Sequence, residues 1–196
     1  MRVDVSRPIR SVVPSLDGPV LEVLAFTTAP LTLAEVHRQA GGSKSGVRQV
    51  LRRLVGDGLV HDVPGGYVLN RDHVAAGAVE LLANLHGELA GRIRAEVERW
   101  PGTVDLVGLF GSAARRDGDS SSDIDLLVVS DAAALPDLVD HLSERIRAWT
   151  GNPAQVLGIS RADVRRLRRT KEPIVTGWDR DLVVIAGDRR VLRRTA

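Results

Sequence analysis

The sequence of 196 residues contains no cysteine and no long apolar run. The missing cysteines exclude disulfide bonds and thiolate metal sites, and they are compatible with a reducing cytoplasm. No stretch of about 18 apolar residues is available to span a bilayer, and the opening MRVDVSRPIRSVVPS lacks the apolar core of a secretory signal. We therefore expect a cytoplasmic protein without a membrane partner.

Lysine is nearly absent as well. Lys44 and Lys171 are the only lysines among 27 basic residues, and 25 acidic residues leave a formal net charge of +2. Arginine favours planar, bidentate contacts with phosphates and carboxylates, although a genome biased toward arginine codons gives the same skew. So small a net charge does not by itself indicate a nucleic-acid-binding protein. The length and the apolar fraction of 43% fit two small globular domains.

Three helices are predicted in the first third of the chain, over residues 18–27, 32–40 and 43–57. Thr32 and Glu35 form a capping box at the start of the second helix. In the third helix, apolar residues recur at i, i+3, i+4 and i+7, which is typical of one buried helix face. The third helix therefore buries one face and exposes the other.

A hairpin is predicted after the third helix, because residues 59–63 and 67–69 are short runs on either side of a Pro-Gly-Gly turn. Helices followed by a hairpin resemble the winged helix-turn-helix domain of bacterial regulators, to which we assign residues 1–71. The resemblance implies that the third helix enters the major groove of DNA.

The exposed face of that third helix carries the residues expected to contact DNA. Lys44, Arg48 and Arg52 lie four apart, with Gln49 and Arg53 beside them. A charged helix face is more often simply solvated, and winged helices also dock onto proteins. We favour duplex DNA as the partner, because positive charge concentrates on the one helix that this arrangement presents.

Residues 72–100 predict one long connecting helix. The segment has no proline, and its apolar residues recur at helical spacing. Such a helix would extend roughly 40 Å. It could join two domains or pair with a second copy of itself, and we favour the connector over a homodimer seam.

The last part of the chain, residues 101–196, alternates strands with helices and predicts an α/β sandwich, so that the whole chain combines α+β and α/β architecture. A second capping box, Ser160 with Asp163, begins one of the helices. The other predicted helices cover residues 112–116 and 137–149, and the predicted strands cover residues 104–110, 123–129, 154–159 and 182–186.

The stretch LFGSAARRDGDSSSDIDLLVV, residues 109–129, places a Gly-Ser after one strand and two aspartates at the start of the next. Gly111 lets a phosphate approach closely, and Ser112 adds a hydroxyl donor at a helix start. Asp123 and Asp125 turn their carboxylates to the same face of a strand. Magnesium held by these carboxylates and by substrate phosphates would offset their repulsion. The combination fits nucleotidyl transfer.

Residues 109–129 have two other interpretations, a polar loop and a calcium-binding loop. A polar loop with idle acids is disfavoured, because Ile124, Leu126 and Leu127 mark a strand buried on both faces, where unpaired carboxylates are costly. A calcium loop is excluded, because Ser122 and Val128 occupy the places of its glycine and its bidentate glutamate.

This motif resembles the signature of the DNA polymerase beta-like nucleotidyltransferase superfamily, most closely its minimal bacterial members, over about residues 102–187. The implied fold is a small mixed sheet with helices, and the implied ligands are Mg²⁺ and ATP or another nucleoside triphosphate. The resemblance assigns nucleotide binding to Gly111, Ser112, Arg115, Arg116 and Ser122, catalysis to Asp123, Asp125 and Arg115, and metal binding to the same two aspartates. Arg116 stands where the family often has glycine, which implies a stiffer loop or an additional phosphate contact.

A second departure concerns the strand after the amphipathic helix. Active members of the family usually have a third carboxylate there, and this chain has Gln155. An amide oxygen can ligate a metal but cannot take a proton from an acceptor hydroxyl. The change from a carboxylate to Gln155 therefore affects the expected turnover more than the expected binding of nucleotide or metal.

Three functions remain open at this point. The leading hypothesis is transfer of AMP from ATP to a hydroxyl, on an acceptor protein, by an antitoxin-like protein that binds DNA. The second is a transcriptional regulator that binds nucleotide without turnover. The third is a small-molecule adenylyltransferase similar to aminoglycoside-modifying enzymes.

Overall fold

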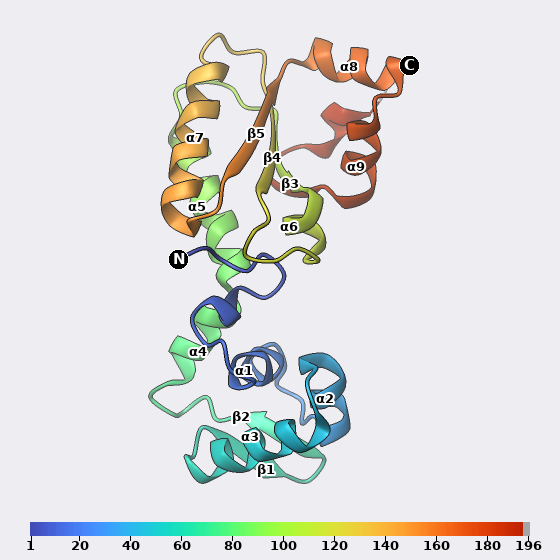
Figure 1. The fold of residues 1–196 in the computed structure, drawn as a ribbon. Coiled ribbons are helices and arrows are strands. Elements are labelled where there is room, and N and C mark those ends of the chain that lie inside the picture. The colour runs from blue at the N-terminus through green and yellow to red at the C-terminus, as the bar shows by residue number, and fades with distance from the viewer. Residues whose placement is uncertain (194–196) are drawn as a thin grey trace. The chain divides into compact units, whose positions relative to one another are not determined.

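The computed structural model describes residues 1–193, and the chain divides into two compact units (Figure 1). One unit is Arg7–Glu88, and the other combines Met1–Ser6 with Leu89–Ala196. Within the described residues, no helix is both long and apolar enough to cross a bilayer.

The unit Arg7–Glu88 is a helix-turn-helix followed by a hairpin, as the sequence predicted. Thr32 caps the second helix: its hydroxyl accepts from the Glu35 N–H at 3.3 Å, and the Glu35 carboxylate accepts from the Thr32 N–H at 2.8 Å. The two strands pair antiparallel, and Leu31 adds a bridge to Tyr67. The elements are η1 (Pro8–Ser11), α1 (Asp17–Ala25), α2 (Leu33–Ala40), α3 (Lys44–Gly56), β1 (Val60–Val63), β2 (Gly66–Leu69) and α4 (Ala76–Ala83).

One core holds this unit together. The buried side chains come from every helix of the unit, and Val47, Leu51 and Leu54 form the inner face of α3. These three residues follow the spacing that predicted the buried helix face. The opposite face of α3 is thereby turned to solvent.

The predicted single helix over residues 72–100 is wrong. The helix begins only at Ala76 and is divided at Asn84, which ends α4 and precedes α5 (Leu85–Arg99). Asparagine competes with helical hydrogen bonding through its side chain. Gly87 leaves room for that side chain, since a Cβ there would lie 2.5 Å from Asn84 Oδ1. The pair Asn84 and Gly87 was the sequence signal for the interruption.

The larger unit is a four-stranded mixed sheet with helices on both faces, in the order β5-β4-β3-β6. β4 is parallel to β5 and antiparallel to β3, which is antiparallel to β6. Besides α5, its elements are β3 (Leu106–Phe110), α6 (Gly111–Arg115), β4 (Ile124–Val129), α7 (Leu135–Thr150), β5 (Ala154–Ile159), α8 (Arg161–Thr170), α9 (Pro173–Asp181), β6 (Val183–Gly187) and η2 (Arg189–Leu192).

Alternate residues of β4 enter two separate cores. Leu126 and Val128 pack with α5 and α7, whereas Leu127 and Val129 pack with α8 and α9. Figure 1 shows the two pairs of helices on opposite sides of the sheet. Because side chains alternate along a strand, Asp125 faces the side covered by α8 and α9. Helix α9 was not predicted from the sequence.

The first six residues pair with this larger unit. The N–H of Val3 donates to Thr150 O at 3.0 Å and to Asn152 Oδ1 at 2.8 Å, and Val5 is buried in the core beside α5 and α7. No hydrophobic pattern in so short a segment signals this pairing, so the predicted winged-helix domain of residues 1–71 wrongly includes residues 1–6.

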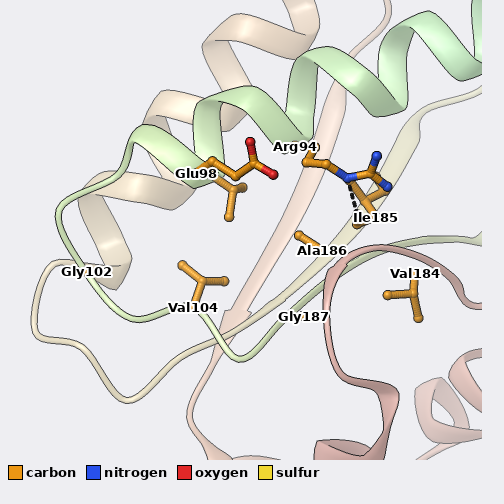
Figure 2. Close-up of a pocket in the computed structure, with 9 residues that line it drawn as sticks. Arg94, Glu98, Gly102, Val104, Val184, Ile185, Ala186 and Gly187 are labelled. Atoms are coloured by element: carbon orange, nitrogen blue, oxygen red, sulfur yellow. Dashed lines mark hydrogen bonds between the residues drawn. The ribbon is translucent and has the colours of Figure 1, made fainter.

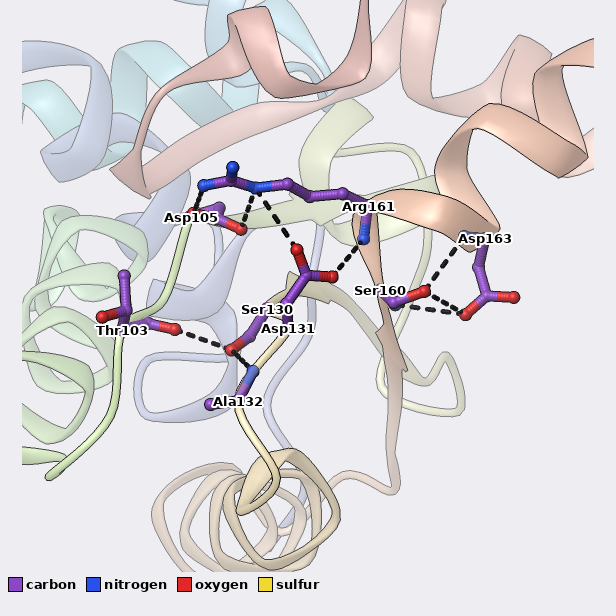
Figure 3. Close-up of polar contacts among 8 residues, drawn as sticks. All are labelled: Thr103, Asp105, Ser130, Asp131, Ala132, Ser160, Arg161 and Asp163. Atoms are coloured by element: carbon purple, nitrogen blue, oxygen red, sulfur yellow. Dashed lines mark hydrogen bonds and ion pairs between the residues drawn. The ribbon is translucent and has the colours of Figure 1, made fainter.

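Two arginines contact the sheet away from the Gly-Ser motif. Arg94 of α5 lines a groove of about 590 Å³ along β6, and its Nε donates to the Ile185 carbonyl at 2.8 Å (Figure 2). Arg161 forms ion pairs with Asp105 and Asp131, which links β3, β4 and α8 (Figure 3). Strand β6 lies at an edge of the sheet, so the Arg94 contact occupies a carbonyl on that edge strand.

Candidate active site

The Gly-Ser turn and the aspartate pair meet at one end of the sheet. Strand β3 ends at Phe110, and α6 follows without a linker because Gly111 adopts φ +68°. Phe110 is the register partner of Asp125. A Cβ at Gly111 would overlap Oδ2 of Asp125, so the backbone of the turn lies directly against that carboxylate. The sequence predicted this neighbourhood, and the structure brings the two parts of the motif together.

Asp125 is a half-buried carboxylate next to another carboxylate. Burial raises its pKa, the charge of Asp123 adds to the rise, and the charge of Arg115 opposes it. Within residues 1–193, no donor forms a hydrogen bond with the Asp125 carboxylate. A buried acid without a donor is costly unless a cation compensates it.

Gln155 contacts the other aspartate. It lies on β5 in parallel register with Asp125, and its Nε2 donates to Asp123 Oδ2 at 2.6 Å. The side chain that replaces the expected third carboxylate is therefore placed at the site, as the sequence predicted. It stabilises Asp123 as a donor, where a carboxylate would have repelled it.

Arg115 lies at the last turn of α6 and has two acidic partners. Its Nε donates to Asp117 Oδ2 at 2.8 Å, and its Nη1 donates to Asp181 Oδ2 at 2.7 Å. These contacts raise the pKa of Arg115, first through the hydrogen bond to Asp117. The guanidinium is therefore a permanent, oriented positive charge beside the aspartate pair.

The remaining predicted nucleotide-binding residues have different placements. Ser112 is the second residue of α6, and no described residue forms a hydrogen bond with its hydroxyl. Arg116 caps α6 with φ +58°, a left-handed conformation that favours glycine and accounts for the glycine usual there. The Ser122 hydroxyl accepts from the Asp119 N–H at 3.0 Å, so it closes the loop before the acids.

The residues at this site fit a divalent cation that is only partly held by protein. Within the part of the chain that the structure describes, no group of three or more acidic or histidine ligands gathers. Asp123 and Asp125 present two carboxylates at the start of one strand, and burial together with the charge of Asp123 raises the pKa of Asp125. Magnesium is commonly held in this way, by one or two carboxylates with substrate phosphates.

A second candidate surface lies on α3 in the other unit. Arg48, Gln49 and Arg52 are exposed and line a shallow hollow, and Lys44 is exposed at the helix start. Arg48, Arg52 and Lys44 form no ion pair with any described residue. Arg53, by contrast, is paired with Asp17 and Asp57. The sequence grouped Arg53 with the others, and only its pairing separates it from them.

Sequence reasoning missed the acidic partners of Arg115. Asp181 ends α9, and this helix lacks a long apolar repeat. Its usable signal was Pro173 at the first helical position. Asp117 follows Arg115 at a spacing that implies no contact in a helix. Both contacts depend on where the chain turns after α6 and α9.

Comparison with known families identifies both parts of the chain. Residues 91–185 match the nucleotidyltransferase domain, and residues 19–64 match the IclR helix-turn-helix domain. The chain thus joins an N-terminal helix-turn-helix domain to a nucleotidyltransferase domain of the polymerase beta-like fold. This confirms both resemblances that the sequence motifs had indicated. No curated protein matches the chain.

Two solved structures are similar to part of the chain. One is a toxin-antitoxin complex with AMP-PNP, with 15% identity, a TM-score of 0.36, and coverage of 53% of this chain and 74% of that chain. The other is the tri-AMPylated HEPN toxin of Shewanella oneidensis in complex with the MNT antitoxin, with 15% identity, a TM-score of 0.35, and coverage of 54% and 75%. Likeness at this level supports no inference about function.

Proposed function

We propose that the nucleotidyltransferase domain transfers a nucleoside monophosphate from ATP to an acceptor hydroxyl. The observation that carries the proposal is the contact between the Gly111 turn and the unpaired, half-buried Asp125, with Asp123 beside it. A phosphate-binding turn and a cation site then share one place. The resemblance in sequence implies that the substrate is a nucleoside triphosphate, with ATP preferred.

Each side chain has a defined part in this proposal. Asp123 and Asp125 would hold Mg²⁺, which when bound neutralises charge on the reacting phosphates. Gly111 admits the phosphates close to the backbone, and Ser112 offers its hydroxyl as a donor. Arg115 places a fixed positive charge where negative charge develops on the leaving pyrophosphate.

Gln155 is expected to limit the rate of transfer, because it stands where a proton acceptor would be. Attack of the acceptor oxygen on the α-phosphorus breaks the bond to the β-phosphate oxygen, and the acceptor proton must also leave. The Gln155 amide cannot accept that proton. It passes to solvent or to a base that the acceptor brings. We therefore expect slow turnover with simple alcohols and faster turnover with an acceptor protein that carries its own base.

Labelling with radioactive ATP tests the proposal. The protein is incubated with α-labelled ATP, Mg²⁺ and candidate acceptors, and the products are separated. Label on a protein is the expected result. Intact bound ATP would favour a nucleotide-sensing regulator, which the hydrogen bond from Gln155 to Asp123 also permits. Label on an aminoglycoside would favour a small-molecule adenylyltransferase. If the protein binds neither ATP nor Mg²⁺, all three nucleotide-dependent functions are excluded.

The substitution Gln155→Asp is expected to raise kcat for transfer to a hydroxyl by about tenfold or more, because it supplies the missing proton acceptor. Gln155→Ala is the control, since it removes the 2.6 Å contact to Asp123 without adding a base. Single-turnover kinetics at saturating ATP and Mg²⁺ measure both. Equal rates for Gln155→Asp and the wild type would show that proton removal is not limiting.

We infer a second function, DNA binding, for the helix-turn-helix domain. The unpaired Lys44, Arg48 and Arg52, with Gln49, support it, because they occupy the solvent face of the helix expected to enter the major groove. Cations without protein partners can pair with DNA phosphates at no cost in lost ion pairs.

Substitution on α3 tests this inference. Arg48→Ala and Arg52→Ala are each expected to weaken binding to duplex DNA and to lower the slope of log K against log salt by about one unit. Arg53→Ala should leave the slope unchanged, since Arg53 already pairs with Asp17 and Asp57. Fluorescence anisotropy over a KCl series measures these slopes. Equal losses for all three variants would argue for general destabilisation of the helix.

A further inference from the structure

Asp181 is a buried carboxylate held between two arginines. Its side chain is 4% exposed. Arg115 donates to its Oδ2 at 2.7 Å, and Arg180 donates through Nε to Oδ1 at 2.7 Å and through Nη2 to Oδ2 at 2.8 Å. Hydrogen bonds from Arg180 and then from Arg115 hold the pKa of Asp181 well below its usual range. The group is therefore a permanent anion that α9 presents to α6.

The two acidic partners fix the plane of the Arg115 guanidinium. Asp117 takes the Nε–H and Asp181 takes an Nη1–H, and these nitrogens lie on different edges of a rigid, planar fork. Nη2 forms no hydrogen bond with any described residue. Arg115 therefore keeps donors available for a ligand while its orientation is set.

Of the two partners, Asp181 has the less exposed carboxylate. The Asp117 side chain is 53% exposed, so water and salt screen its ion pair with Arg115. Asp181 is the last residue of α9, whose Val175 and Trp178 pack in the core on the same sheet face as Asp125. Because the Asp181 carboxylate is shielded from water, its ion pair with the partly exposed Arg115 is screened less than the pair with Asp117 is.

The oriented charge lies close to the aspartate pair. Arg115 ends the short helix α6, whose first residue, Gly111, lies against the Asp125 carboxylate, and the charge of Arg115 lowers the Asp125 pKa in part against the larger effects of burial and Asp123. The guanidinium is thus within electrostatic reach of the place where ATP phosphates and Mg²⁺ would meet. Helix α6 determines where the Arg115 guanidinium lies, and the hydrogen bond to Asp181 of α9 orients it.

We propose that Asp181 is a positioning residue, which orients Arg115 so that the guanidinium meets the phosphates of bound ATP. The inference rests on the proposed function, which gives Arg115 its phosphate contact. Asp181 itself touches neither nucleotide nor metal in this account. Its effect must therefore vanish when Arg115 is absent.

A double-mutant cycle tests this dependence. The dissociation constant of Mg²⁺-ATP is measured by calorimetry for the wild type, Asp181→Asn, Arg115→Ala and the double variant. Asp181→Asn is expected to weaken binding about tenfold in the wild-type background. In the Arg115→Ala background it should change binding by less than about twofold. Equal losses in both backgrounds would show that Asp181 acts only on the fold, and would overturn the inference.

Two further variants guard against unfolding as the cause. Asp179→Asn alters a carboxylate on the same helix that pairs with Arg168 and not with Arg115, so nucleotide affinity should stay unchanged. Asp181→Glu keeps the charge and should recover part of the affinity lost in Asp181→Asn. Thermal unfolding of every variant shows whether the folded state persists at the assay temperature.

Side-chain NMR gives a readout that does not need nucleotide. The Arg115 guanidinium resonances should show slow rotation in the wild type and in Asp179→Asn, and faster rotation in Asp181→Asn. Unchanged rotation in Asp181→Asn would contradict the anchoring. If the wild-type chain holds Arg115 immobile but binds no Mg²⁺-ATP, the proposed function and this inference both fail. If the wild type binds Mg²⁺-ATP, but Asp181→Asn lowers the affinity equally with and without Arg115, the inference alone fails.

Discussion

The substitution Asp125→Asn is expected to reduce Mg²⁺-dependent transfer of label from ATP by about a thousandfold or more. The carboxylate lies against the Gly111 turn, and it is one of the two that we propose hold Mg²⁺. An amide is a weaker ligand and carries no charge. Initial rates with α-labelled ATP and titration of Mg²⁺ by calorimetry should fall together.

The same variant should be more stable than the wild type when no metal is present. Burial and the charge of Asp123 raise the Asp125 pKa above 3.8, so the ionised group destabilises the folded state. The stability that the protonated form provides is complete below pH 3.8 and is lost as pH rises through the folded pKa. Asp125→Asn should therefore raise Tm by about 2 °C at pH 7.5, with a smaller gain as pH falls toward 4.5.

Asp140→Asn is the matched control for both measurements. Asp140 is an exposed carboxylate on α7, so its replacement changes the net charge by the same amount without touching the site. Its transfer rate and its Tm should equal those of the wild type. A loss of transfer in Asp125→Asn together with a fall in Tm at neutral pH would mean that Asp125 supports the fold and not a cation.

Local patterns in the sequence were sufficient to predict most elements and the contact between the Gly-Ser turn and the aspartate pair. Both capping boxes formed, because each depends only on residues three apart. The contact between Gly111 and Asp125 followed from a strand, a turn and a strand that are close in the chain. The family resemblance located Gln155, and the parallel register of β5 with β4 brings its side chain to Asp123.

The parts that were missed depend on contacts distant in sequence. Arg115 and Asp181 are 66 positions apart, and their pairing requires α9 to lie over the sheet. Residues 1–6 are held through the backbone of Val3, which bonds to the Thr150 carbonyl and to the Asn152 side chain and so leaves no pattern in the residues of this segment. The break at Asn84 shows the opposite case, where a local signal was present but was outweighed by a long helical repeat.

Gly111→Ala is expected to have the second large effect, a loss of transfer of about a hundredfold. Gly111 has φ +68°, which costs an alanine roughly 1 kcal/mol or more. The new methyl group would also overlap Oδ2 of Asp125 and displace the carboxylate from its position beside the turn. Metal and phosphate sites would then be misaligned, although every proposed ligand is still present.

Comparison with a second glycine separates these local effects from a general one. Gly91→Ala alters α5, where a Cβ meets nothing within 4 Å, so it should leave transfer unchanged and stabilise the helix by about 0.5 to 1 kcal/mol. For Gly111→Ala, the Kd for Mg²⁺ should rise with the Kd for ATP, because one displaced carboxylate weakens both. Loss of ATP affinity with an unchanged Kd for Mg²⁺ would instead mean that the turn contacts phosphate independently of Asp125, and that cation and phosphate do not share this end of the sheet.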